Sequence, residues 1–490
     1  MEFNSFAYIG FLALVACVYY LLPLLGRKIL LVAASFVFYM AWNAKYSLLM
    51  LAVILITYAA AVGLVQLPRY RRLFFYTALT LVLGLLFYFK YFNFFIDTLN
   101  HVFALHLDFL NVLLPVGISF YVFQAVGYLV DVYRDDNACE RSLLTYTLFI
   151  SFFPQLVAGP IERSENMMRQ FHTKQVFRLE NLKNGITLIL VGLVEKVVIA
   201  DRLAVFVNGV FDGYQTAGRL TLLTAAVFFA FQVYCDFNAY SLIAIGSARI
   251  MGYRLMNNFR SPYLSRSFAD YWSRWHISLS SWFQDYIFTP FVWTNPLRKL
   301  SSRFSAPPMR TGLLLVFLAS GFWHGANWTF VTWGLLHAAF RIFEASTARP
   351  KKRFLKKHGI SLNNPLLKTG EILLTFSLNC LTYIFFRAVS VGQAGDYIRC
   401  IFAGNASPAA MDSFGLNRGG LLFSCGAIAV LMLLQILEER KKQERMPDVR
   451  IDALSVPMQS LIYAGLFLLL AVFGMYGTNY VENPFIYFQF

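Results

Sequence analysis

Two histidines are the residues of this sequence that could most directly do chemistry, because each lies in a run rich in tryptophan. His324 lies in GFWHG at 321–325, and His276 lies in WSRWHISLS at 272–280. A buried histidine that binds no metal can take a proton from a hydroxyl group and so act as a general base. Transfer of an acyl group from a thioester to a hydroxyl needs such a base and a second polar group that orients a reactant. We therefore predict His324 as the base and His276 as the second group.

The composition indicates an all-α integral membrane protein. Of the 490 residues, 58% are hydrophobic and 14% are charged, whereas about a quarter of a soluble domain is charged. Uncharged stretches such as 48–65, 73–89 and 421–437 approach the roughly 20 residues that a helix needs to cross the hydrocarbon core. Such segments must be helical, because lipid cannot bond to open backbone groups. The stretch 6–22 is followed by basic residues rather than preceded by them, which favours a retained span over a signal peptide.

Clusters of basic residues set the expected topology, since they favour the cytoplasmic side. Arg27 with Lys28 forms the first cluster and residues 69–72 form the second, with two apolar segments between them. We expect about eleven to thirteen membrane helices, some of them re-entrant, in a single polytopic domain over 1–490. Both termini are then extracytoplasmic. The clusters also explain the net charge of +16, so we predict membrane lipid, and no nucleic acid, as a partner.

The segment before His324 predicts its depth in the membrane. The apolar residues 311–322 give about 18 Å of helix, too short to cross a core of about 30 Å. Gly325 and Asn327 then break the helix, which places His324 inside the membrane. Irregular backbone at that depth is tolerated only within protein or beside a cavity.

The segment 271–285 predicts one amphipathic helix, because Trp272, Trp275 and Leu279 recur at a spacing of three or four residues. Its aromatic face suits the membrane interface or a re-entrant position. Arg274 and His276 point away from that face.

Other ionisable residues are predicted to be structural. On one straight helix His337 would face away from His324, so the two make a poor metal pair. The six cysteines show no metal-ligand spacing, and we predict no metal site. Glu195 and Lys196 are adjacent and opposite in sign, and with Asp236 they are interpreted as structural groups.

Six motifs resemble, in order and over nearly the whole chain, those of the membrane-bound O-acyltransferase family. The resemblance is to its bacterial branch, which O-acetylates alginate or peptidoglycan. The motifs are LPVGISF (114–120), FPQLVAGPI (153–161), YCDFNAYS (234–241), WSRWHISLS (272–280), GFWHG (321–325) and FFR (385–387). The chain departs from the family pattern at Leu242, where an aspartate is expected.

The resemblance implies a multi-helix ring around a central tunnel, in a bacterial inner membrane. It matches His324 to the near-invariant family histidine and His276 to an earlier polar position. It implies acetyl-CoA as the donor, with no permanently bound cofactor. The acetyl group would pass to a secreted or membrane-anchored periplasmic acetyltransferase partner or to a cell-surface polysaccharide. Arg274, Asn327 and Asp285 are further candidates for positioning donor or acceptor, and basic residues of 298–310 for contacting CoA phosphates.

The last residues, 483–490, resemble the C-terminal peptide of the small subunit of D-alanylation systems. By that resemblance Tyr487 is a candidate acyl relay, and the alternative is an aromatic interface anchor. Two other functions remain open. A transporter or flippase would predict internal repeats, which this sequence does not show. A non-catalytic assembly subunit of a polysaccharide export system would need neither histidine.

Overall fold

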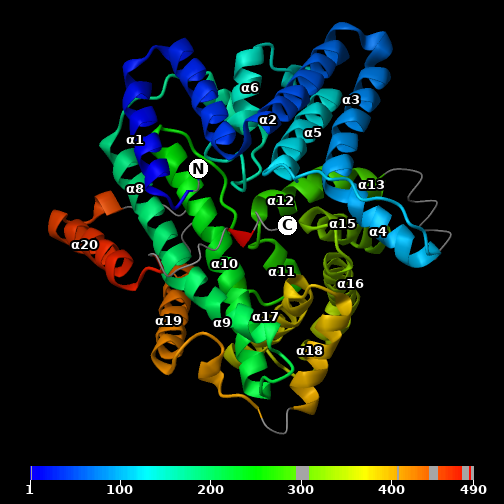
Figure 1. The fold of residues 1–490 in the computed structure, drawn as a ribbon, viewed down its shortest axis with the longest axis vertical. Coiled ribbons are helices and arrows are strands. Elements are labelled where there is room, and N and C mark those ends of the chain that lie inside the picture. The colour runs from blue at the N-terminus through cyan, green and yellow to red at the C-terminus, as the bar shows by residue number, and fades with distance from the viewer. Residues whose placement is uncertain (2, 294–307, 405–407, 441–450, 477–484, 487–490) are drawn as a thin grey trace. The chain divides into compact units, whose positions relative to one another are not determined.

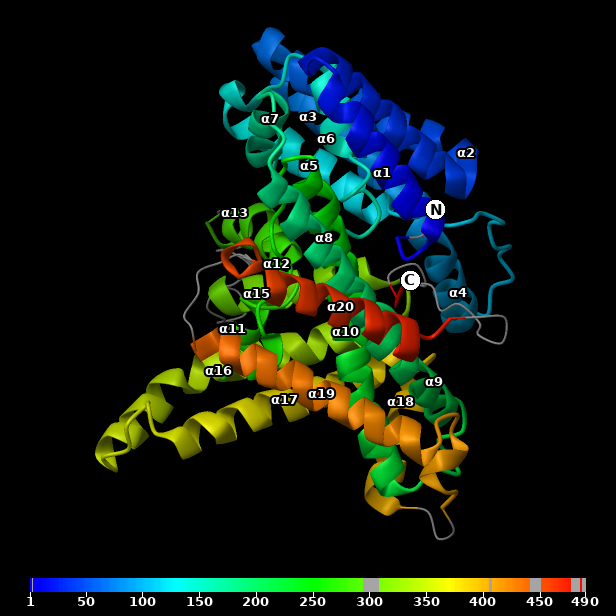
Figure 2. The same ribbon diagram turned by 90° about the vertical axis from the view of Figure 1, so that its left-hand side faces the viewer.

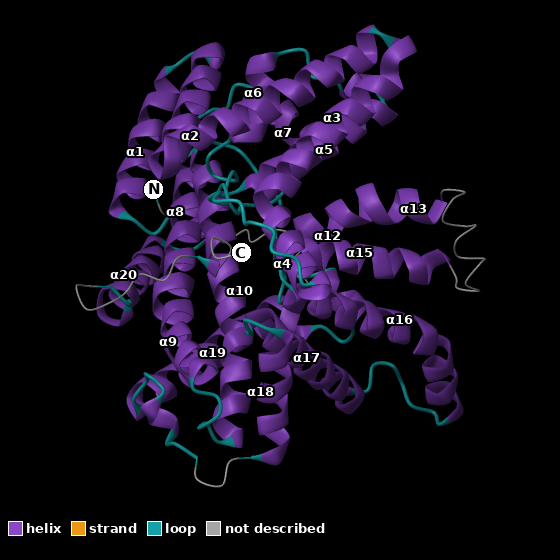
Figure 3. Ribbon diagram, turned by 45° about the vertical axis from the view of Figure 1, so that its right-hand side comes forward, coloured by secondary structure: helices purple, strands orange, loops and turns teal. Residues whose placement is uncertain are grey.

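The computed structural model describes the chain except for residues 2, 294–307, 405–407, 441–450, 477–484 and 487–490 (Figure 1). The described part is helical and contains no β-strand (Figure 3), which confirms the all-α class. The chain divides into two compact units, each built from segments distant in sequence. Unit 1 is Met1–Leu193, Ala239–Asn257 and Pro447–Leu468, and unit 2 is Val194–Asn238, Asn258–Met446 and Leu469–Phe490. A single domain over 1–490 stays a prediction.

Unit 1 contains the helices of the N-terminal part of the chain. They are α1 Phe6–Leu21, α2 Leu24–Gln66, α3 Arg71–Leu86, α4 Phe92–Phe103, α5 Ile118–Arg134, α6 Leu143–Ser151, α7 Ser164–Phe171 and α8 Leu179–Leu193. Helix α2 is interrupted at Asn43, where φ is −158° and ψ is 112°. The interruption divides α2 into two helices, in agreement with the two apolar segments expected there.

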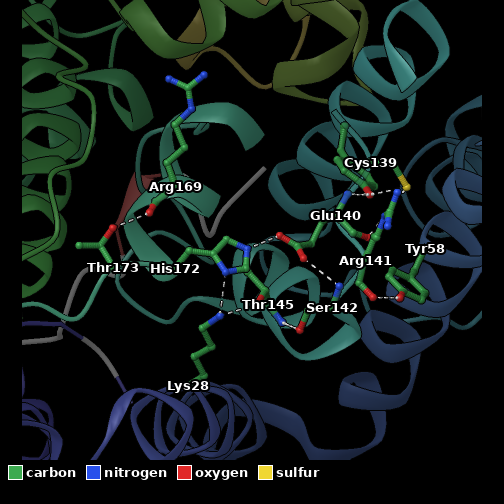
Figure 4. A network of polar contacts seen from close by, with 11 residues as sticks. Lys28, Tyr58, Cys139, Glu140, Arg141, Ser142, Thr145, Arg169, His172 and Thr173 are labelled. Carbon is green, nitrogen blue, oxygen red and sulfur yellow. Dashed lines mark hydrogen bonds and ion pairs between the residues drawn. The ribbon is translucent and has the colours of Figure 1, made fainter. Parts of the chain in front are cut away.

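The first basic cluster is buried inside unit 1, and its cytoplasmic placement stays a prediction. Arg27 and Lys28 lie in the first turns of α2. Lys28 Nζ donates to Thr145 Oγ1 at 2.8 Å and lies 3.3 Å from His172 Nδ1 (Figure 4). His172 Nε2 in turn lies 2.6 Å from Glu140 Oε2. These partners explain how the lysine is tolerated inside unit 1.

Unit 2 contains the helices that carry the candidate site. They are the π-helix η4 Val194–Ala200, α9 Asp201–Asp212, α11 Phe268–Trp272, α12 Ile277–Phe283, the π-helix η6 Gln284–Phe288, α13 Thr289–Trp293, α15 Pro308–His324, α16 Trp328–Lys357, α17 Pro365–Arg387, α18 Val391–Ala403 and α19 Arg418–Arg440. Figure 2 shows α16 and α17 running side by side. Two further helices, α10 Arg219–Ile250 and α20 Val456–Phe473, contribute residues to both units.

Six helical segments of the described chain are long and apolar enough to cross a membrane. They are Leu24–Gln66, Pro68–Phe103, Arg219–Ile250, Pro365–Arg387, Arg418–Arg440 and Val456–Phe473. Helix α20 leaves Leu461, Leu468 and Val472 exposed, as expected for a surface that meets lipid tails. The chain is therefore a multi-pass membrane protein, while the total of eleven to thirteen helices stays a prediction.

The prediction of one continuous amphipathic helix over 271–285 is wrong. Helix α11 ends at Trp272 and α12 begins at Ile277. Between them His276 has φ 44° and ψ 53°, in the left-handed region. Trp275 and Leu279 are buried inside unit 2 rather than placed at a membrane interface. The spacing of the apolar residues was helical, but hydrogen bonds to a distant segment break the helix.

Candidate active site

His324 is the last residue of α15, where the chain turns back into α16. Two glycines bring these helices together. A Cβ atom on Gly321 would lie 2.5 Å from the Phe330 carbonyl oxygen, and one on Gly334 would lie 2.3 Å from the Phe317 carbonyl oxygen. No side chain fits at those separations, so glycine is required for this close approach.

The helix break after His324 is confirmed where the sequence predicted it. Asn327 caps α16, with its Oδ1 accepting from the Thr329 N–H at 3.0 Å. Its Nδ2 donates to the Val389 carbonyl at 3.2 Å. Helix α15 has 17 residues, about 26 Å of helix, which is longer than predicted but still short of a core of about 30 Å.

Aromatic rings surround the His324 imidazole, which is 4% exposed. The ring centroid lies 5.0 Å from Trp323, 4.9 Å from Trp333 and 5.3 Å from Phe386. The three interplanar angles lie between 73° and 82°, the edge-to-face arrangement that aromatic pairs favour. This environment keeps bulk water away from the imidazole.

His276 is fully buried and is held by a segment that the sequence did not connect with it. The Asn258 carbonyl accepts the Ile277 N–H at 2.9 Å, and Asn258 Oδ1 accepts the Ser278 hydroxyl at 2.6 Å. These bonds fix the chain immediately after His276 and so stabilise its left-handed backbone. Sequence reasoning missed Asn258 because no periodicity or motif spacing relates it to His276.

The two histidines lie against the same indole. The Trp323 ring centroid is 5.5 Å from that of His276 and 5.0 Å from that of His324. The His276 ring also packs against the ring of Phe237, with a centroid separation of 4.6 Å and an interplanar angle of 89°. The structure thus brings together the two residues that the sequence singled out, in one apolar environment.

Burial favours the neutral form of the His276 imidazole. It lies between α11 and α12, outside the six candidate spans. Burial lowers its pKa to about 3, because a charged imidazolium loses its hydration there. A neutral imidazole has one nitrogen that donates and one that accepts, so it can orient a hydroxyl or a carbonyl group.

His337 lies deeper in the same aromatic cluster and has a packing role. Its ring centroid is 4.6 Å from Trp333 and 5.2 Å from Trp272, and its Nε2 lies 3.1 Å from Thr382 Oγ1. The expectation that His337 and His324 face apart assumed one straight helix. It is wrong, because the chain folds back after His324 and both rings pack on Trp333.

Arg274 is engaged by two carboxylates. Its Nε lies 2.6 Å from Asp270 Oδ1, and its two terminal nitrogens lie 2.9 Å from the two oxygens of Glu439. Its carbonyl accepts the Arg260 N–H at 2.9 Å. These contacts make Arg274 part of the frame that holds the segment before His276, and its role toward a donor stays a prediction.

The remaining predicted residues are dispersed or undescribed. Asp285 is exposed on η6. Tyr487 and the basic residues of 298–307 lie outside the described residues. Within the described ranges no group of three or more histidine, cysteine, aspartate or glutamate side chains could hold a metal ion. An imidazole can in general transfer a proton or orient a polar group, and the two buried histidines bring that capacity to the site.

Comparison with known proteins agrees with a helical membrane acyltransferase. The model of the membrane-bound O-acyltransferase family matches residues 134–385, a range that contains His276 and His324. The probable alginate O-acetylase AlgI of Pseudomonas putida is 31% identical over 99% of both chains. The peptidoglycan O-acetyltransferase of Helicobacter pylori is 33% identical over 80% of this chain and 76% of its own. The teichoic acid D-alanyltransferase of Streptococcus thermophilus is 27% identical over 55% of this chain and 68% of its own.

The fold and the site define a multi-pass helical membrane protein with two imidazoles buried against one indole. The chain belongs to the membrane-bound O-acyltransferase family, and it is an O-acyltransferase of the kind found in the polysaccharide O-acetylation branch. This assignment decides against a transporter or a non-catalytic assembly subunit, the two alternatives that the sequence left open.

Proposed function

We propose that the protein takes an acetyl group from cytoplasmic acetyl-CoA and passes it across the membrane to a hydroxyl group. The final acceptor is a cell-surface polysaccharide, reached directly or through an extracytoplasmic acetyltransferase partner. The names of the relatives, for alginate and peptidoglycan O-acetylation, support this cargo and this class of acceptor. The observation that carries the proposal is the burial of His276 and His324 against one indole.

The proposed route follows from the family. Acetyl-CoA approaches from the cytoplasm and the acceptor from outside, through a tunnel within a ring of helices. The protein lies in the bacterial inner membrane with both termini extracytoplasmic. The six candidate spans support a multi-pass arrangement in which donor and acceptor reach one buried site from opposite sides.

In the proposed reaction, His324 takes the proton of the acceptor hydroxyl as its oxygen attacks the thioester carbonyl. The new C–O ester bond forms, the C–S bond breaks, and the CoA thiolate leaves and recovers a proton from the imidazolium. Atoms and charge then balance without a metal. The aromatic residues around His324 exclude water, which would otherwise compete with the acceptor and hydrolyse the thioester.

His276 is proposed to orient a reactant rather than to exchange a proton. Its neutral imidazole can donate a hydrogen bond to the thioester carbonyl, where negative charge develops in the transition state. The bonds that Asn258 accepts from Ile277 and Ser278 hold the backbone on the C-terminal side of His276. Such a preorganised donor contributes more than a mobile one, since it needs no reordering during the reaction.

Tyr487 is proposed as an intermediate carrier of the acetyl group. Its phenol oxygen would accept the acetyl group as an ester and pass it to the partner. The burial of the two residues before it, Phe485 at 1% and Ile486 at 5% exposure, supports a chain end that reaches into unit 2. A detectable acetyl group on Tyr487 in the intact mass of the protein, formed with donor by wild type but not by a Tyr487→Phe variant, tests this step.

The test of the main proposal is complementation of a deletion strain with wild type, His324→Ala or His358→Ala. His358 lies exposed at the end of α16 and is the matched control. We expect His324→Ala to abolish acetylation of the surface polysaccharide at unchanged membrane levels, and His358→Ala to retain it. Retained acetylation in the His324→Ala strain would remove His324 as the base. Identifying which polysaccharide loses its acetyl groups names the acceptor.

A further inference from the structure

A cluster of three charged side chains lies buried in unit 2. Lys196 Nζ lies 2.7 Å from Asp236 Oδ1 and 2.9 Å from Asp201 Oδ1. The three side chains are between 1% and 4% exposed. One positive and two negative groups leave a net negative charge, which is unfavourable in a dry interior unless further donors compensate it.

The end of the chain supplies such a donor. The backbone N–H of Ile486 donates to Asp236 Oδ2 at 2.7 Å, the short distance typical of a charge-assisted bond. The ring of Phe485 lies over Lys196, with its centroid 4.5 Å from Nζ, within the range of a cation–π contact. Lys196 and Asp236 thus both contact the chain end directly.

A second contact holds the chain where α20 ends. The Met475 N–H donates to the Val197 carbonyl at 2.8 Å. Val197 belongs to the π-helix η4, and π-helical turns are frequent at functional sites because they disturb the regular bonding of the helix. Lys196 lies on the same π-helix. The segment after α20 is therefore held at Met475 and again at Ile486.

The second contact lies near the middle of a candidate membrane span. Asp236 lies near the middle of α10, one of the six candidate membrane spans. Phe485, which is not helical, therefore approaches the middle of a span. Irregular backbone at such depth needs protein partners or a cavity, and the Asp236 carboxylate is such a partner.

We propose that Lys196, Asp201 and Asp236 form a releasable binding site for the C-terminal segment of this chain. The site recognises an aromatic side chain through Lys196 and the following N–H through Asp236. A charged site of this kind can be vacated, since water can replace the N–H and solvate the carboxylate. A free peptide with the sequence of the C-terminal segment should therefore compete with it for the site. Binding requires no acetyl donor, so this inference stands apart from the proposed reaction.

Carboxypeptidase digestion of the full-length protein in detergent tests the site. The quantity measured is the rate at which Ile486 and Phe485 are lost, followed by intact mass. Digestion of a segment that opens transiently follows the population of its open state. Asp236→Asn removes the charge that holds the Ile486 N–H, and we expect a rate on the order of tenfold to a hundredfold higher than in wild type.

Asp201→Asn is the matched control, because it removes the other carboxylate from Lys196 but leaves the bond to Ile486. We expect its rate to stay within about threefold of wild type. Phe485→Leu, which leaves all three charges in place, should raise the rate a few-fold through loss of the cation–π contact. This variant keeps the test decisive if Asp236→Asn does not fold.

A C-terminally amidated peptide of residues 481–490, which resists the enzyme, tests release. The tethered segment experiences an effective concentration on the order of millimolar, so millimolar peptide should raise the wild-type rate at least about twofold. Equal rates for Asp236→Asn and Asp201→Asn, or a wild-type rate equal to that of denatured protein, would overturn the site. If the peptide does not raise the digestion rate, the proposed release of the C-terminal segment would be refuted.

Discussion

Replacing Asn258 by alanine tests whether the position of His276 depends on one side chain. The hydrogen bond between Asn258 Oδ1 and Ser278 Oγ is 2.6 Å long, and both residues are at most 1% exposed. Removing the acceptor from a buried hydroxyl costs about 1–3 kcal/mol. His276 also holds a left-handed backbone, which is unfavourable by about 1–2 kcal/mol for a residue with a Cβ. The loss of the bond therefore favours relaxation of the segment away from this conformation.

The expected result is a larger loss of activity than of stability. We expect Asn258→Ala to lower the free energy of unfolding by about 1–3 kcal/mol. We expect the rate of acetyl transfer to fall by on the order of a hundredfold, the effect that a displacement of about 1 Å has on a catalytic group. The assay is transfer from acetyl-CoA by protein reconstituted in vesicles, with thermal unfolding of the same preparation.

Ser278→Ala removes the same bond from its other end and is the partner of a double-mutant cycle. Since both variants lose one shared interaction, the double variant should lose much less than the sum of the two single losses. A wild-type transfer rate in Asn258→Ala would refute the positioning role. Strict additivity of the two variants would show that the bond itself does not hold His276.

Two further predictions concern the helix pair and pH. Gly334→Ala should destabilise the protein by about 1–3 kcal/mol, because the new Cβ would meet the Phe317 carbonyl. The control is Gly370→Ala, whose Cβ would have no atom within 4 Å and which should be neutral or stabilising by up to about 1 kcal/mol. Equal melting temperatures of the two variants would contradict the close approach of α15 and α16. Burial raises the pKa of Glu162 from 4.5 to about 7, although N–H groups of Met256 and Asn166 oppose the shift. Its contribution to stability should be complete below pH 4.5 and lost as pH rises through about 7, and Glu162→Gln should flatten this part of a melting profile recorded between pH 4 and 8.

Local features of this fold could be predicted from sequence. The uncharged stretch 421–437 lies within α19, and its length and composition alone demand a helix in lipid. The break after His324 follows from Gly325 and from Asn327, an effective N-cap. In each case the residues that decide the conformation are the residues that adopt it.

The break at His276 could not be predicted in this way. The spacing of Trp272, Trp275 and Leu279 is compatible with a continuous helix, and the local sequence contains no glycine or proline. The hydrogen bonds that break the helix come from the backbone of Arg260 and from Asn258. Only tertiary structure brings that segment to the histidine, so no local pattern could reveal it.

The partners of the buried charged residues could not be predicted from the sequence either. Glu195 and Lys196 are adjacent and opposite in sign, but Lys196 binds Asp201 and Asp236. Glu195 instead accepts the Asn238 side-chain amide at 2.8 Å. Successive residues of a helix point about 100° apart, so neighbours in sequence rarely share partners.

The different directions of successive helical side chains also relate the chain end to the histidine site. Asp236 and Phe237 are consecutive in α10 and therefore point in different directions from one turn. Asp236 binds the Ile486 N–H, and Phe237 packs edge-on against His276. One turn of α10 thus contacts both the last described residue of the chain and His276. Tyr487 follows Ile486 directly in the sequence. The proposed acetyl carrier is therefore one residue beyond the contact with Asp236.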